Sequence, residues 1–255
     1  MRIDLLKYSA AVFAAMALWA CSSRQSVAIE YPGNSSNRVV FAAEHLDSVL
    51  QTMGYDVLPA LEGAPEGTKV IRLSMVSDSV GPKEGFTITT VNDTINVIGN
   101  DGSGVIYGCR EVIDRVGFGG SLDSVPAEFT DAPEMVLRGA CVGVQKPYLL
   151  PGRAVYEYPY TPDNFPWFYD KELWVKYLDM LVSNRMNSLY LWNGHPFASL
   201  VKLEDYPFAI EVDDETFKKN EEMYSFITNE ADKRGIFVIQ MFYNILLSKP
   251  FAEHY

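Results

Sequence analysis

Hydrogen-bonding side chains follow three apolar segments of the sequence. The polar residues are Gln145 and Lys146 after the first segment, Asn193 and His195 after the second, and Asn244 after the third. Amide, amine and imidazole groups can exchange hydrogen bonds with a polar ligand, and Gly194 would let the backbone approach such a ligand closely. We therefore expect a binding site where these segments end. The alternative is a set of loops that simply needs those backbone conformations.

Aromatic residues form a second candidate group. They are dense between Tyr148 and Tyr169, in a stretch with several prolines that exclude a regular helix or a central strand. Aromatic side chains on irregular loops often face a ligand. We expect Tyr158 and Trp167, with Trp192 at the end of the second apolar segment, to contact it. The alternative is that these rings pack in the core.

The elements that must position these residues alternate between strands and helices. Apolar strands begin near Arg138, Asn187 and Ile236, and amphipathic helices are predicted over 170–186 and 216–234. This alternation is typical of a parallel sheet, whose ligand sites form at the carboxyl ends of the strands. The fold class is therefore α/β: residues 137–255 are predicted to form the first three βα units of an incomplete TIM barrel, with the extra chain length on one rim.

A smaller α+β domain is predicted over residues 29–120. It contains a helix over 37–53, strands over 55–61 and 68–75, and a hairpin from Phe86 to Gly99 that turns at Asn92-Asp93. A helix over 105–116 follows, with Glu111 on its solvent face. Residues 121–136 are rich in Gly, Ser, Asp and Pro and are predicted to be a linker.

Several stretches resemble glycoside hydrolases. The hairpin followed by "GVIYGCREVID" resembles the small domain that precedes the barrel in family 20 (β-hexosaminidases) and family 67 (α-glucuronidases). "YLDMLVSNRMNSLYLW" and "ADKRGIFVIQMF" resemble the entries into the second and third barrel strands of families 20, 67 and 84. The pair Arg138-Gly139 matches an Arg-Gly of family 20, which implies that Arg138 binds sugar hydroxyls on the same rim as Asn193 and Asn244. The following Ala140-Cys141-Val142-Gly143 departs from the family 20 pattern.

The resemblance implies an O-glycosyl hydrolase, hexosaminidase- or glucuronidase-like, acting on a polysaccharide or glycan. Glycoside cleavage generally requires two carboxylates, and in these families the acid lies at or after the fourth strand. We therefore expect the catalytic residues beyond Tyr255 and the chain to be an inactive fragment of a longer enzyme. A non-catalytic glycan-binding surface lipoprotein is the main alternative. A barrel enzyme with different chemistry is the third possibility.

The first residues predict export. Arg2 and Lys7 precede an apolar run over 8–20 that is too short to span a bilayer and fits a secretory signal. Leu18, Ala20 and Cys21 resemble a bacterial lipobox, which implies a lipoprotein signal peptide over 1–21, lipidation of Cys21 and a tether over 22–28. A plain signal peptide is the alternative. We expect an outer-membrane or cell-surface lipoprotein, with the periplasm as second choice.

Charge and cysteine content restrict the remaining partners. The net charge is −12, and no Lys/Arg cluster suggests nucleic-acid binding. Cys109 and Cys141 lack metal-ligand spacing and are predicted to be buried free thiols. No metal or other cofactor is expected. The predicted partners are a carbohydrate and, through the lipid anchor, a membrane.

Overall fold

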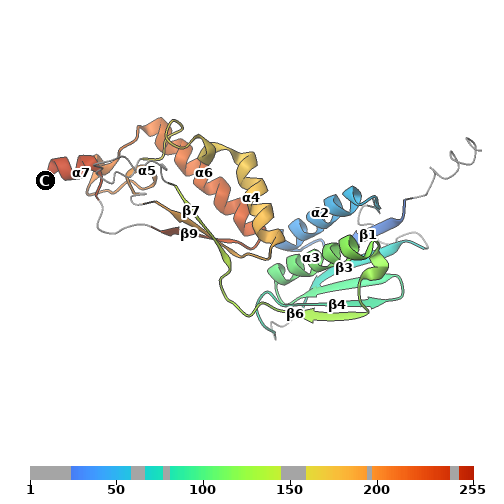
Figure 1. The fold of residues 1–255 in the computed structure, drawn as a ribbon. Helices are drawn as coiled ribbons and strands as arrows, with labels where there is room; N and C mark the ends of the chain where they lie inside the picture. Colours follow the sequence, from blue (N-terminus) through green and yellow to red (C-terminus); the bar gives the residue numbers. More distant parts are fainter. Residues whose placement is uncertain (1–23, 59–66, 77–80, 145–158, 194–196, 242–246) are drawn as a thin grey trace, which may run out of the picture.

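The computed structural model describes residues 24–58, 67–76, 81–144, 159–193, 197–241 and 247–255. Within them, two sheets follow one another along the chain, each with two helices packed on one face (Figure 1). Several predictions fall outside the described residues: the signal peptide with Cys21, and the site residues Gln145, Lys146, Tyr158, His195 and Asn244.

The first sheet has six strands in the order β2-β1-β3-β5-β4-β6. β1 runs parallel to β2 and β3, and β3 runs parallel to β5, whereas β4 is antiparallel to β5 and β6. Helices α2 (Asn37–Thr52) and α3 (Gly102–Gly119) cover one face (Figure 1). The strands are β1 (Ser26–Glu30), β2 (Asp56–Leu58), β3 (Lys69–Met75), β4 (Phe86–Val91), β5 (Thr94–Gly99) and β6 (Glu128–Asp131), and a short 3₁₀ helix, η1 (Leu122–Ser124), precedes β6.

Local sequence explains the hairpin and the helix that follows it. The predicted hairpin is confirmed, because Val91 pairs with Thr94 across a two-residue turn in which Asn92 has a φ of 52°. The Asp101 carboxylate caps α3 by accepting a hydrogen bond from the Gly104 N–H at 2.8 Å. Gly104 is required there, because a Cβ would overlap the carbonyl oxygen of Gly85.

The structure differs from the predicted boundaries at both ends of this domain. β1 begins at Ser26, inside the predicted tether, because Val27 and Ile29 are buried in the core on one side of the strand. β6 lies inside the predicted linker and pairs with β4 from Phe86↔Asp131 to Thr89↔Glu128. Its alternation of half-buried and exposed residues is too short to distinguish from a loop by composition alone.

The second sheet is the predicted parallel one. Its strands lie in the order β7 (Gly139–Gly143), β8 (Ser188–Trp192) and β9 (Phe237–Met241), all parallel. Helices α4 (Lys171–Ser183) and α6 (Asp214–Lys233) connect them and pack on one face, where Leu189 and Leu191 are fully buried. The short helices are η2 (Pro166–Tyr169), α5 (Phe197–Leu200), η3 (Pro207–Ala209) and α7 (Lys249–His254). The three parallel strands and the two connecting helices predicted for the start of a barrel are thus observed.

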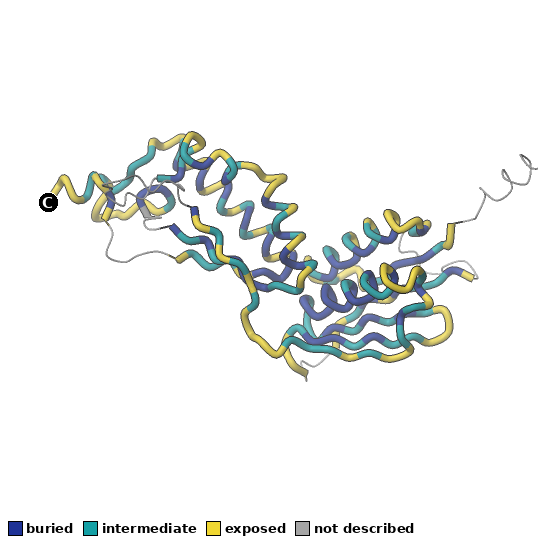
Figure 2. Tube along the Cα trace, in the orientation of Figure 1, coloured by how far each residue is buried: buried dark blue, intermediate teal, exposed yellow. Residues whose placement is uncertain are grey.

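Among the described residues, no helix covers the opposite face of this sheet (Figure 2). Pairing across the strands places Tyr190 between Cys141 and Ile239, and Trp192 between Gly143 and Met241. Cys141 is a free thiol, as predicted, but it is exposed on this face, so the prediction that it is buried is wrong. Cys109 is a free thiol and is buried in α3, as predicted.

Ion pairs join the two parts of the molecule. Arg185, between α4 and β8, contacts Glu111 of α3 and donates to Asp131 of β6 at 2.9 Å. Arg38 of α2 donates to Asp232 of α6 at 2.7 Å and to the Ser103 hydroxyl at 3.1 Å. Glu111 is therefore buried rather than on the predicted solvent face. The helical pattern alone could not show this, because its partner Arg185 comes from a distant segment.

Candidate functional site

The carboxyl ends of β7, β8 and β9 meet at one edge, which we call the carboxyl edge. Asn193 is buried there and links all three strand ends: its amide Nδ2 donates to the Val144 carbonyl at 2.9 Å, and its backbone N–H donates to the Met241 carbonyl at 3.2 Å. Val144 in turn donates to the Trp192 carbonyl at 2.8 Å. The polar residue predicted from its place after a strand therefore organises this edge.

Trp192 lies at the same edge, on the face without helices. Side chains alternate along β8, so Leu189 and Leu191 point toward α4 and α6 while Trp192 points the other way. It is half-buried and is flanked by Gly143 and Met241 in the neighbouring strands. A broad ring beside a glycine at a strand end can offer a flat surface to a ligand.

Most of the described aromatic loop is core. Tyr160, Phe165 and Phe168 are fully buried, with ring centroids 5.0 Å apart for Tyr160 and Phe168. The core-packing alternative holds for these rings, because the prolines set an irregular backbone but do not keep side chains outside. Trp167 is half-buried and lines a small apolar cavity of about 150 Å³ with Val142 and Trp174.

Arg138 lies at the other end of the sheet. It precedes β7, and its carbonyl accepts hydrogen bonds from the backbone N–H groups of Asn187 and Ser188, at the amino ends of the strands. Its guanidinium donates to the Glu84 carboxylate at 2.7 Å and to the Tyr107 hydroxyl at 3.1 Å. The expectation that Arg138 shares a rim with Asn193 is therefore not met, because Arg138 starts its strand and Asn193 follows the end of the neighbouring one.

The Tyr107 hydroxyl, which contacts Arg138, has a shifted pKa. Burial raises the pKa of Tyr107 to about 12, and the Glu84 carboxylate raises it further, whereas Arg138 lowers it. The phenol therefore stays protonated at neutral pH and can accept the hydrogen bond from Arg138. These groups form a structural junction at the amino ends of the strands.

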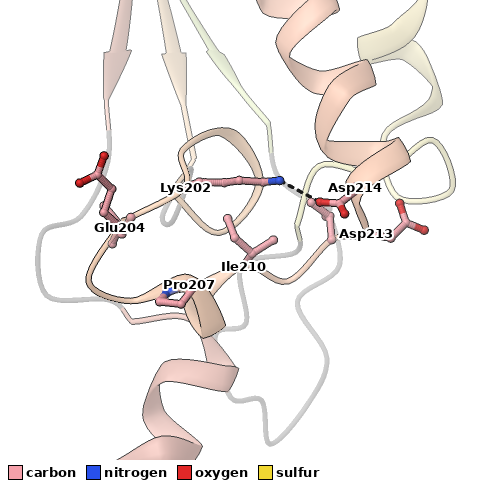
Figure 3. A pocket seen from close by; sticks show the side chains of 8 residues that line it. Lys202, Glu204, Pro207, Ile210, Asp213 and Asp214 are labelled. Carbon is pink, nitrogen blue, oxygen red and sulfur yellow. Dashed lines mark hydrogen bonds and ion pairs between the residues drawn. The ribbon is translucent and has the colours of Figure 1, made fainter.

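A larger cavity of about 620 Å³ lies in the segment between α5 and α6 (Figure 3). Its polar lining consists of Lys202, Glu204, Asp213 and Asp214, and its apolar lining includes Pro207 and Ile210. The Lys202 ammonium reaches across it to the Asp214 carboxylate at 2.8 Å. Sequence reasoning missed this cavity, because acidic residues such as Asp213 and Asp214 at the start of a predicted helix are already accounted for by the helix N-terminus. Asp213 does accept from the Thr216 N–H at 2.7 Å, which lowers the pKa of Asp213.

Two further properties concern only the described part of the chain. No group of three His, Cys, Asp or Glu side chains there has an arrangement that could hold a metal ion. None of the helices described is both long and apolar enough to cross a membrane.

No protein-family model matches the chain, and no curated protein sequence is similar to it. Among solved structures, a glycoside hydrolase family 138 enzyme targeting pectin rhamnogalacturonan II is 60% identical, with a TM-score of 0.81 over 90% of this chain. The chain spans only 26% of that enzyme.

Family 20 structures are more distant. The chitobiase of Flavobacterium johnsoniae is 13% identical with a TM-score of 0.54, and the match covers 85% of this chain and 31% of that one. The β-N-acetylhexosaminidase of Streptomyces coelicolor A3(2) is 15% identical with a TM-score of 0.50, covering 85% of this chain and 41% of that one. These likenesses show the fold alone. The expected similarity to glycoside hydrolases is confirmed, and at high identity it is to a family 138 enzyme.

Proposed function

We propose that this chain forms part of an O-glycosyl hydrolase that acts on a polysaccharide, with a pectic polysaccharide as the favoured substrate. The observation that carries the proposal is the 60% identity, over 90% of the chain, to a family 138 enzyme that targets pectin rhamnogalacturonan II. The family 20 structures are 13% and 15% identical and support only the fold, so a hexosaminidase activity has less support.

The carboxyl edge is the part of the chain that we assign to substrate contact. Trp192 would present its ring to a sugar face, and Asn193 would hold the ends of β7, β8 and β9 in register around it. Gln145, Lys146, Tyr158, His195 and Asn244 remain candidates for hydrogen bonds to sugar hydroxyls by their place in the sequence. We assign no ligand contact to Trp167, because its ring packs against other aromatic rings.

Catalysis would require an acid and a second carboxylate on either side of the scissile bond. We assign neither role to a described residue and expect both carboxylates on βα units other than those seen here. The contribution of this chain is then to bind and orient the polysaccharide at the carboxyl edge.

We further propose that the protein is exported and anchored through Cys21, on the strength of Leu18, Ala20 and Cys21 after a short apolar run. Expression in a Gram-negative bacterium with membrane fractionation and mass spectrometry tests this. A lipid-modified wild-type protein beside an unmodified Cys21→Ser variant supports the anchor. An unmodified wild-type cysteine rejects it.

Activity is best tested in a chimera, because the chain spans a quarter of the family 138 enzyme. The matched segment of that enzyme is replaced by this chain, and sugar release from rhamnogalacturonan II is followed by anion-exchange chromatography. We expect the chimera to release the same product as the parent enzyme, while the parent without the segment is inactive. A folded chimera that binds the polysaccharide without cleaving it would favour the glycan-binding alternative.

A further inference from the structure

We propose that the cavity between α5 and α6 is a second sugar-binding pocket, which takes a neutral sugar unit of the polysaccharide in preference to a uronic acid. The inference rests on the proposed function, since it concerns a unit of the substrate other than the one being cleaved. We call this cavity the α5–α6 pocket and define it by Lys202, Leu203, Glu204, Pro207, Ile210 and Asp214.

The size and place of the pocket suit a sugar. Its volume of about 620 Å³ lies in the range of small-molecule sites. It is formed by the segment that leads from the carboxyl end of β8 into α6, so it lies on the same side of the sheet as the carboxyl edge (Figure 3). A polysaccharide bound at that edge can therefore extend a neighbouring unit into it.

The lining offers both kinds of contact that a pyranose needs. Pro207, Ile210 and Leu203 supply apolar surface for the C–H face of a ring. Glu204 and Asp214 supply carboxylate oxygens that accept hydrogen bonds from hydroxyl groups, and Lys202 supplies a donor. The Lys202–Asp214 pair is 55% and 93% exposed at its two side chains, so it is weak enough to open toward a ligand.

Charge selects the class of sugar. Glu204, Asp213 and Asp214 bring three carboxylates, against the single ammonium of Lys202. A uronic acid would add a further negative charge to a pocket that is already negative, whereas a neutral sugar meets acceptors for its hydroxyl groups. A divalent cation is not the preferred ligand, because no metal-holding group of three acidic, His or Cys side chains exists among the described residues.

The frame of the pocket is held by contacts on both sides. Asp213 caps α6 through the Thr216 N–H. Below the pocket, η3 is packed against α7, with Phe208 stacked on His254 at 4.0 Å and Tyr206 beside Phe251 at 5.3 Å. The Lys249 N–H of α7 donates to the Glu211 carboxylate at 2.6 Å. The lining side chains therefore project from fixed backbone.

The test compares two ligands that differ only at C6, methyl β-galactopyranoside and its uronic acid counterpart. The full chain is labelled at Ile, Leu and Val methyl groups, and the spectra of Ile210 and Leu203 are followed during titration. We expect saturable shifts with the neutral sugar and affinity for the uronate that is lower by about threefold or more. Glu204→Gln should narrow the difference in affinity between the two ligands, whereas Glu222→Gln, a matched change on α6 outside the pocket, should not.

Equal or tighter binding of the uronate, or no shift of these methyl groups with either ligand, overturns the proposal. Sugar release by the chimera is measured separately. If the chimera cleaves rhamnogalacturonan II but the methyl groups of the pocket do not respond to sugar, the pocket proposal is rejected and the hydrolase proposal stands. If the pocket responds but the chimera binds the polysaccharide without cleaving it, the hydrolase proposal is rejected and the pocket proposal stands.

Discussion

The Arg138 guanidinium donates to the Glu84 carboxylate at 2.7 Å, and this pair joins the two sheets of the molecule. Glu84 lies two residues before the first strand of the hairpin in the first sheet, and Arg138 immediately precedes the first strand of the second sheet. Asn187, at the start of the next strand, donates to the other Glu84 oxygen at 3.0 Å. One carboxylate from the small domain thus holds the amino ends of two neighbouring barrel strands.

Removing this carboxylate charge should lower the stability of the whole chain. The Arg138 and Glu84 side chains are only 14% and 13% exposed, so Glu84→Gln leaves a buried guanidinium without its counter-charge. We expect the free energy of unfolding to fall by about 3 kcal/mol, measured by urea denaturation. Glu30→Gln is the control, because Glu30 pairs with Arg72 at 26% and 53% exposure and should cost less than about 1 kcal/mol. Equal losses in the two variants would contradict a special role for the junction.

Gly139 should tolerate no side chain. A Cβ at this position would overlap the carbonyl oxygen of Ser188 on the adjacent strand, and backbone cannot move aside cheaply. We expect Gly139→Ala to destabilise the chain by about 2 kcal/mol or more in thermal or urea unfolding. Gly33→Ala is the matched control, since a Cβ there has no neighbour within 4 Å and should change stability little. If both variants unfold alike, β7 and β8 are not as close as described.

Sequence periodicity predicted the elements whose burial is decided within the element. The Phe86–Gly99 hairpin, the helices over 37–53 and 170–186, and the parallel order of the last three strands all follow from local pattern and turn chemistry. The roles that failed depend on partners far along the chain. Glu111 is a polar residue on a helix, yet it is buried in an ion pair with Arg185 between the two parts of the molecule. The aromatic loop looked exposed because of its prolines, yet Tyr160 and Phe168 pack inside.

The position of Asn193 at a strand end was predictable, whereas its contacts within the protein were not. Asn193 was identified because it directly follows an apolar strand, and the structure shows it linking strand ends. The cavity beside Lys202 and Asp214 was missed, because its lining is spread over irregular backbone between α5 and α6 that no periodicity marks.

His45 should make stability depend on pH. Its ring stacks on Phe41 with centroids 5.7 Å apart, and its Nε2 is buried without a hydrogen-bond partner among the described residues. Burial lowers the pKa of His45; Asp179 opposes this, whereas Arg110 and Arg234 add to it. Because the folded state favours the neutral ring, the unfolded chain binds the proton first as pH falls. The stabilisation is therefore complete above about pH 6.5 and is lost as pH falls through the folded pKa.

The measurement is the urea midpoint between about pH 7.5 and 5, an interval that contains the ordinary histidine pKa. His45→Phe keeps the stack on Phe41 and should flatten the decline. His254→Phe, at an exposed position in α7, should leave it as in the wild type. A decline that persists unchanged in His45→Phe would show that other groups cause it.

Trp192 and Trp167 were both predicted to contact ligand, and their surroundings now predict opposite outcomes. Trp192 lies at the carboxyl edge on the face without helices, whereas Trp167 packs among Phe165, Phe168 and Trp174.

In the chimera, Trp192→Ala should lower kcat/KM for rhamnogalacturonan II by about tenfold or more, equivalent to about 1.4 kcal/mol of lost contact. Trp192→Phe should retain most of it, because an aromatic face remains. Trp167→Ala should instead lower the free energy of unfolding by about 2 kcal/mol, because a large half-buried ring that packs against the core is removed. Enzyme kinetics and urea unfolding of all three variants separate these effects. Loss of kcat/KM in Trp167→Ala at unchanged stability, with none in Trp192→Ala, would move the substrate surface from the carboxyl edge to the aromatic loop.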